Sequence, residues 1–251
     1  VYDGSRYIDF NDDWRFYLAT RTPTAIDGDV TKGLMDPPGA PTTSEIINPG
    51  FDDSSWRTLD VPHDWSIEGE KVSNANNSQG YLQGGLGWYR KTFTLPDSIS
   101  EKKVFIEFDG VYAHSVVYVN GQMVGEYPNG YTGFCYDITP YVTFGPDNPN
   151  VIVVKVMNMA PSGRWYTGSG IVNPVNLIVT DKTFFLRHGI TYKTPDLENT
   201  YKNDGSAVLD VKADIYSDAP NGIAYIKTTV YDAEGKIVTE PVSSQIVDYN
   251  P

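Results

Sequence analysis

Histidines and serines are the first residues to consider for chemistry, because they serve as metal ligands and as nucleophile–base pairs. The three histidines are His63, His114 and His188, and no two of them lie at a metal-ligand spacing such as i, i+4. Ser169 lies in a glycine-rich run but lacks the Gly-x-Ser-x-Gly elbow of serine hydrolases. The sequence therefore predicts no metal site, and it does not favour a catalytic triad.

Carboxylates are the second candidates, since glycoside hydrolysis needs two of them facing each other across the scissile bond. Glu68 and Glu70 would share a face if they lay on a strand, but such carboxylates are usually solvated. The glycine-rich stretch 80–87 is no phosphate cradle, because no Lys-Ser/Thr follows it and a strand comes next. We assign no catalytic residue within the chain.

Two segments combine residue types that suit sugar recognition. Segment 61–65 has the sequence VPHDW. Either Trp65 packs in the core while Asp64 caps a turn, or the loop offers a carboxylate to sugar hydroxyls and a ring for stacking. Segment 162–171 places Arg164 and Trp165 in a glycine-rich loop after a core strand. There we favour recognition over an arginine that merely stacks on its neighbour, because such loops often carry function.

Composition narrows the class of protein and its partners. The chain has 251 residues, a net charge of -13 and 13% aromatic residues. An acidic chain without basic runs is a poor partner for nucleic acid or an anionic membrane, and no stretch approaches the roughly 20 apolar residues of a membrane span. The single cysteine, Cys135, allows no internal disulfide and is expected to be a small buried hydrophobe.

Short apolar runs bounded by turn residues predict an all-β chain. Strands are expected near 89–95, 104–108, 115–119, 151–157 and 175–179, and Asn120-Gly121 predicts a type I′ hairpin turn. The stretch 72–87 is expected to be a long loop, which is often functional in a compact domain. We predict a jelly-roll β-sandwich over residues 1–187.

The strand pattern restarts after residue 187. Residues 209–215 and 224–230 alternate between apolar and polar side chains, which is typical of strands with one buried face. We predict a second, smaller immunoglobulin-like β-sandwich over residues 188–251. Only about 64 residues remain for it, against roughly 100 in that fold, so we expect this domain to be truncated.

Taken together, these segments resemble glycoside hydrolase family 2, in order and spacing, over residues 7 to about 187. The matching segments, beside 61–65, are 87–93 (GWYRKTF), 108–112 (FDGVY), 117–121 (VYVNG), 125–134 (GEYPNGYTGF), 137–139 (DIT), 150–158 (NVIVVKVMN) and 164–171 (RWYTGSGI). One departure lies at 172–174, where Val-Asn-Pro stands in place of the family's usual aromatic residue and arginine.

The resemblance implies a sugar-binding jelly roll, then a sandwich, then a (β/α)8 barrel. In this family the barrel supplies a glutamate acid/base that follows an asparagine, and a glutamate nucleophile. This chain contains no Asn-Glu pair. The resemblance thus implies a non-catalytic portion that lends Asp64, Trp65, Arg164 and Trp165 to the rim of the barrel's pocket. It implies no cofactor here, and it leaves the metal content of the parent enzyme open.

Among the family's activities, the segments PHDW and NGYT-F most resemble β-galactosidases, with β-glucuronidase or β-mannosidase as the next alternatives. The implied partners are a β-galactoside or related carbohydrate and the chain's own catalytic barrel. A stand-alone carbohydrate-binding module is the rival from another class, and a structural spacer is a third. Oligomeric state and compartment stay open, with a periplasmic or secreted location favoured over a cytoplasmic one.

Overall fold

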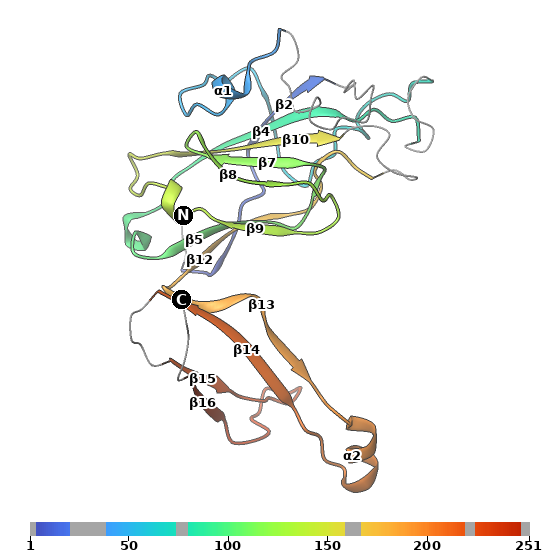
Figure 1. Cartoon of the computed structure of the whole chain (residues 1–251), viewed down its shortest axis with the longest axis vertical. Coiled ribbons are helices and arrows are strands. Elements are labelled where there is room, and N and C mark those ends of the chain that lie inside the picture. The colour runs from blue at the N-terminus through green and yellow to red at the C-terminus, as the bar shows by residue number, and fades with distance from the viewer. Residues whose placement is uncertain (1–3, 21–38, 74–79, 159–166, 219–223, 247–251) are drawn as a thin grey trace. The chain divides into compact units, whose positions relative to one another are not determined.

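The computed structural model describes residues 4–20, 39–73, 80–158, 167–218 and 224–246. The chain divides into two compact units, Val1–Val179 and Thr180–Pro251. Both units are built mainly from antiparallel strands (Figure 1), which confirms the predicted all-β class. In the described part of the chain, no helix is both long and apolar enough to cross a membrane.

The first unit contains two main sheets, which form the two layers of a sandwich in Figure 1. One sheet has four strands in the order β1 (Tyr7–Asp9), β12 (Val175–Thr180), β5 (Lys103–Phe108) and β9 (Phe134–Asp137). The other has six strands in the order β3 (Arg57–Leu59), β2 (Trp14–Thr20), β4 (Gly85–Phe93), β10 (Asn150–Asn158), β7 (Ser115–Val119) and β8 (Gln122–Tyr127). A short ribbon pairs β6 (Val111–Tyr112) with β11 (Gly170–Ile171). Two 3-10 turns, Asp97–Ile99 and Thr139–Tyr141, lie between strands.

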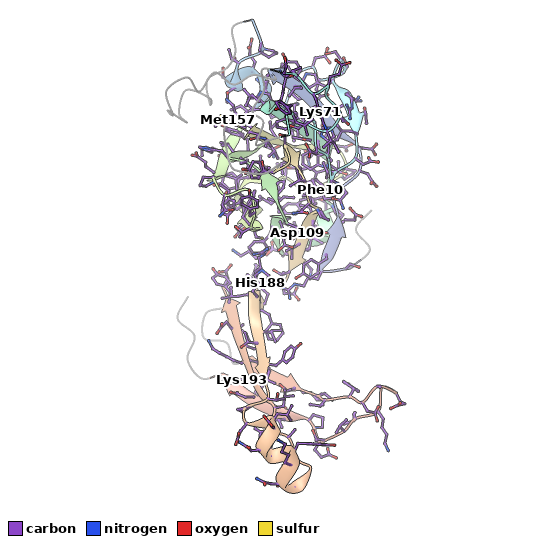
Figure 2. The ribbon with its side chains drawn as sticks, turned by 90° about the vertical axis from the view of Figure 1, so that its right-hand side faces the viewer. Phe10, Lys71, Asp109, Met157, His188 and Lys193 are labelled. Atoms are coloured by element: carbon purple, nitrogen blue, oxygen red, sulfur yellow. The ribbon has the colours of Figure 1, made fainter. Side chains whose placement is uncertain are left out.

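The core of this unit lies between the two main sheets, where side chains of alternating strand residues meet. Phe10, labelled in Figure 2, belongs to it together with Trp14, Phe16 and Tyr89. Along β10, Ile152, Val154 and Val156 point into this core. The alternation seen in the sequence thus sets which face of each strand is buried.

The outer face of the six-stranded sheet is covered as well, which explains why successive residues are buried over all of β10 and over the first six residues of β4. Trp88, Val151 and Val153 pack there against Trp56 and against Ile46 of helix α1 (Thr43–Ile46). The covering segment is also held by charge, because the buried Arg90 donates from Nε to Asp53 Oδ2 at 2.8 Å. The middle of the sheet is therefore buried on both faces.

Local turn chemistry behaves as the sequence predicts at the β7–β8 hairpin. Asn120 and Gly121 both have positive φ angles, of 50° and 80°, as a type I′ turn requires. The glycine-rich stretch differs from its expected loop conformation, because β4 already begins at Gly85. Gly87 lies in that strand opposite Trp65, where an added Cβ would come within 2.7 Å of the indole.

Within its described residues, the second unit contains two ribbons of paired strands. β13 (Thr183–Lys193) pairs with β14 (Asp210–Ser217), and β15 (Ala224–Thr228) pairs with β16 (Val242–Ile246). The units divide after Val179 and not after residue 187, because β13 begins at Thr183 and pairs within the second unit. Helix α2 (Leu197–Asp204) was not predicted, although an i, i+4 pair of Glu198 with Lys202 supports it.

Candidate functional site

An open pocket of about 470 Å³ lies in the first unit, where two segments more than 100 residues apart in the sequence meet. It is lined by Pro62, His63, Asp64, Ile67, Thr167, Gly168 and Val172. One lining segment is the VPHDW loop, and the other is the end of the 162–171 loop. The structure therefore brings together the two segments that the sequence singled out for recognition.

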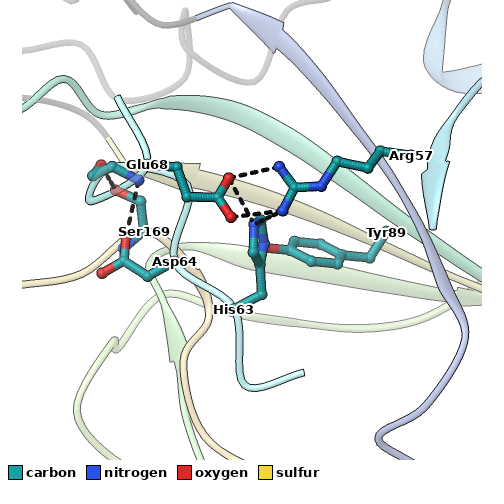
Figure 3. Close-up of polar contacts among 7 residues, drawn as sticks. Arg57, His63, Asp64, Glu68, Tyr89 and Ser169 are labelled. Atoms are coloured by element: carbon teal, nitrogen blue, oxygen red, sulfur yellow. Dashed lines mark hydrogen bonds and ion pairs between the residues drawn. The ribbon is translucent and has the colours of Figure 1, made fainter. Parts of the chain in front are cut away.

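Asp64 is fixed in the wall of this pocket by backbone hydrogen bonds. Its Oδ1 accepts from the amide nitrogens of Ser66 and Ser169, each at 3.0 Å (Figure 3). The first bond caps a turn and the second ties the two segments together. The carboxylate of Asp64 thus caps a turn and also lines the pocket, and its binding of sugar hydroxyls stays a prediction.

Trp65 faces the opposite way and is fully buried in the core. Its ring stacks on Phe16 with centroids 5.8 Å apart, and its Nε1 donates to the carbonyl oxygen of Gly84 at 3.0 Å. The buried ring therefore has no exposed face on which a sugar could stack in this structure, and it supports the loop that carries Asp64. Arg164 and Trp165, the other two expected rim residues, lie outside the described residues.

A buried polar network joins the two pocket segments beneath Asp64. Ser169 Oγ bonds to Ser66 Oγ and to Asn158 Nδ2, each at 2.6 Å. Backbone bonds run alongside, from Trp65 N to Ser169 O at 3.0 Å and from His63 N to Ile171 O at 2.7 Å. Ser169 is therefore a structural residue and not a nucleophile, since its hydroxyl is buried and these partners occupy it.

A charged cluster of Arg57, His63 and Glu68 lies on the other side of the VPHDW loop. The sequence did not predict it. Glu68 accepts two hydrogen bonds from Arg57 of β3, at 2.6 and 2.7 Å, and contacts His63 Nε2 at 3.3 Å (Figure 3). Glu68 lies in a turn and not on a strand, so it shares no strand face with the exposed Glu70. The fork-like pairing explains why Glu68 is not a free acid. Only the fold brings Arg57 to it, and no local spacing signals the pair.

The electrostatics of this cluster favour a charged glutamate and a neutral histidine. Hydrogen bonds from Arg57 lower the pKa of Glu68 to about 2. Burial lowers the pKa of His63, because removal from water disfavours the imidazolium form. Burial also raises the pKa of the Tyr89 hydroxyl, whose oxygen lies 2.7 Å from His63 Nδ1.

These shifts predict a loss of stability in acid. Both pKa values are lower in the folded chain than in the unfolded one, so the unfolded chain binds protons first. We expect the free energy of unfolding to fall as the pH drops below about 6.5, through His63, and again below about 4.5, through Glu68. Urea unfolding between pH 8 and pH 3 measures this. The Glu68→Gln variant should weaken the second decline, whereas the control Glu126→Gln, at the other His–Glu pair, should retain it in full.

In the ranges that the structure describes, no three His, Cys, Asp or Glu side chains gather in a way that could hold a metal ion. Cys135 is half-buried on β9, and so more accessible than the sequence predicted.

Comparison with known proteins identifies the family to which this architecture belongs. Residues 9–191 match the family described as glycosyl hydrolases family 2, sugar binding domain. The chain is 38% identical over 240 residues to the β-galactosidase BoGH2A of Bacteroides ovatus, covering 94% of this chain and 25% of that enzyme. It is 41% identical over 191 residues to a putative β-glucuronidase of Formosa agariphila, covering 75% of this chain and 18% of that protein.

A solved structure agrees with these relatives. The crystal structure of a β-glycosidase from Bacteroides vulgatus superposes with a TM-score of 0.79 at 35% identity, over 97% of this chain and 28% of that one. The chain thus spans about a quarter of the length of the proteins it matches, and it corresponds to their N-terminal part. Its fold, its pocket segments and the match over residues 9–191 show that the chain belongs to glycoside hydrolase family 2.

Proposed function

We propose that this chain is the non-catalytic N-terminal part of a retaining exo-glycosidase acting on β-galactosides, and that it lends rim loops to the pocket of a (β/α)8 barrel. The observation that supports this most directly is Asp64, a carboxylate held in a pocket wall by two backbone amides. A preorganised acceptor of this kind suits the hydroxyl groups of a sugar. The exposed Ile67 beside it offers apolar surface for the sugar's C–H face.

The chemistry of the pocket agrees with a rim and not with a catalytic centre. A retaining glycosidase needs two carboxyl groups about 5–5.5 Å apart, one of them able to act as an acid. Asp64 is the one acidic residue among the described residues that line the pocket. Glu68, the next along the loop, has a pKa lowered to about 2 by Arg57, so it cannot serve as a proton donor near neutral pH.

A β-glucuronidase is the second candidate, because a relative with 41% identity bears that name. A glucuronide carries a carboxylate, which a pocket must meet with a cation. The described wall residues include neither Arg nor Lys, and they do include the carboxylate of Asp64. This wall therefore suits a neutral glycoside better, and a cation for a glucuronide would have to come from the barrel.

The test is an assay of the 251-residue chain with nitrophenyl β-galactoside and nitrophenyl β-glucuronide. We expect a hydrolysis rate no higher than that in buffer alone. We also expect only weak binding of galactose, because the barrel would hold most of the pocket. Weak galactose binding should still shift the NMR signal of the Asp64 carboxyl group. The Asp64→Asn substitution should weaken galactose binding further. Turnover that survives purification and disappears in Glu68→Gln would overturn the proposal. Tight, stoichiometric galactose binding would favour a stand-alone module.

A further inference from the structure

Tyr131, in the connection between β8 and β9, has the most exposed of the large hydrophobic side chains that the structure describes in the first unit, at 71%. The strand register fixes the end of the sandwich at which this connection lies. Tyr127, the last residue of β8, pairs with Ser115 of β7, and Ser115 pairs with Val156 of β10. Asn158, at the end of β10, belongs to the buried network beneath the pocket. Tyr131 thus lies at the same end of the sandwich as the pocket (Figure 1).

The ring of Tyr131 rests on a fixed support, although its side chain is exposed. The amide of Tyr131 donates to Asn129 Oδ1 at 2.7 Å. Its ring meets the buried ring of Tyr112 edge to face, with centroids 5.3 Å apart and planes at 71°. Gly130 lies directly on Tyr112, because an added Cβ would come within 2.1 Å of that ring. The loop is therefore preorganised, and so large an exposed fraction leaves at least one face of the Tyr131 ring open to a ligand.

The residue that supports this ring is a neighbour of the pocket wall. Tyr112 pairs with Gly170 in the β6–β11 ribbon. Gly168 and Val172, which line the pocket, lie just before and just after β11. Paired strands lie about 5 Å apart, and the contact between the two tyrosine rings adds a similar distance, so Tyr131 lies on the order of 10 Å from β11. That separation suits the neighbouring sugar of an oligosaccharide, and not the sugar held in the pocket itself.

We propose that Tyr131 is a stacking platform for a second sugar, so that this end of the sandwich binds a neutral oligosaccharide and not a single hexose. The face of a pyranose ring carries C–H groups, which pack on an aromatic ring, while its rim carries hydroxyl groups. The described wall of the pocket includes no Phe, Tyr or Trp, and Trp65 is buried in the core. Tyr131 supplies the aromatic face that this wall lacks. The choice of a neutral sugar rests on the rim function proposed above.

A titration of the 251-residue chain with galactose and with a linear β-linked galactotriose, followed by NMR, tests the inference. We expect the trisaccharide to bind more tightly than galactose and to shift the ring signals of Tyr131, because only the longer ligand reaches both places. Tyr131→Ala should lower the affinity for the trisaccharide about three- to tenfold and leave the affinity for galactose unchanged. Tyr131→Phe should bind as the unmodified chain does, because stacking needs the ring and not the hydroxyl.

Tyr7 provides the matched control, because it is a tyrosine of the same unit with a side chain that is 55% exposed. It lies on β1 and pairs with Ile178, towards the end of β12 that is remote from Val172. Tyr7→Ala should leave both affinities unchanged. An unchanged trisaccharide affinity in Tyr131→Ala would overturn the inference, and so would an equal loss in Tyr7→Ala. If Tyr131 serves only to pack against another protein surface, no sugar will shift its signals, and this outcome also overturns the inference.

The signals of Asp64 and Tyr131 separate this inference from the proposed function. If galactose shifts the Asp64 carboxyl signal while the trisaccharide leaves Tyr131 unchanged, the rim function stands and the platform is wrong. If the trisaccharide shifts Tyr131 while neither sugar shifts Asp64, the platform stands and the rim function is wrong. If neither signal shifts with either sugar, both proposals are wrong.

Discussion

Replacing Trp65 by alanine is expected to lower the free energy of unfolding of this chain by about 3–5 kcal/mol. The indole is fully buried, stacks on Phe16 and donates to the Gly84 carbonyl oxygen, so the substitution leaves both a cavity and an unpaired acceptor. Gly87 lies against the indole and has no side chain that could fill the cavity. The effect is measured by urea unfolding, with far-ultraviolet circular dichroism as the signal because it does not depend on tryptophan fluorescence.

Ile67 provides the matched control for that substitution. It lies two residues further along the same loop, but its side chain is 64% exposed. Ile67→Ala should therefore change the free energy of unfolding by no more than about 0.5 kcal/mol. If Trp65→Ala proved as mild as Ile67→Ala, then the buried placement of the indole would be wrong and a surface role in sugar stacking would regain support.

Replacing Gly170 by alanine is expected to be the second severe change. Gly170 has a φ of +130°, which side chains with a Cβ rarely adopt, and the added carbon would lie 2.3 Å from Tyr89 Oη and 2.6 Å from His63 O. Backbone strain and overpacking each cost about 1–3 kcal/mol. We expect a combined loss of about 2–6 kcal/mol in the free energy of unfolding, measured by urea unfolding.

Gly205→Ala separates the two causes. Gly205 also has a positive φ, of 74°, but nothing lies within 4 Å of the position that its Cβ would take. Its substitution should cost only the strain, about 1–2 kcal/mol. A Gly170→Ala variant no less stable than Gly205→Ala would show that β11 does not press against Tyr89 and His63. The network that holds Asp64 would then need another explanation.

Much of the fold could be predicted because local pattern decides it. Strands β5, β7, β10 and β12 lie where alternating or continuous apolar runs predict them, and the Asn120-Gly121 turn has the expected geometry. Helix α2 was missed because its residues are almost all polar and exposed, so it lacks the apolar stripe on which helix prediction relies. The division at residue 179 was missed because it depends on how β13 pairs.

The candidate site was predicted only as a pair of segments, and the roles of its residues needed the structure. Nothing in the sequence VPHDW says that Asp64 faces the pocket while its neighbour Trp65 faces the core. That choice is made by Ser169 and Ile171, which bind the loop from more than 100 residues away. The pairing of Glu68 with Arg57 has the same origin, since β3 and the following turn meet only in the folded sheet.

The sequence by itself determined that the chain is all-β and acidic, it placed the candidate recognition residues in two segments, and it showed a resemblance to glycoside hydrolase family 2. These properties follow from local alternation, from composition and from motif order. Only the tertiary structure decided which loop residue is an acceptor at the pocket wall, which is a buried support, and which acid is held by an arginine. These roles depend on burial and on partners distant in sequence, and neighbouring residue types do not encode them.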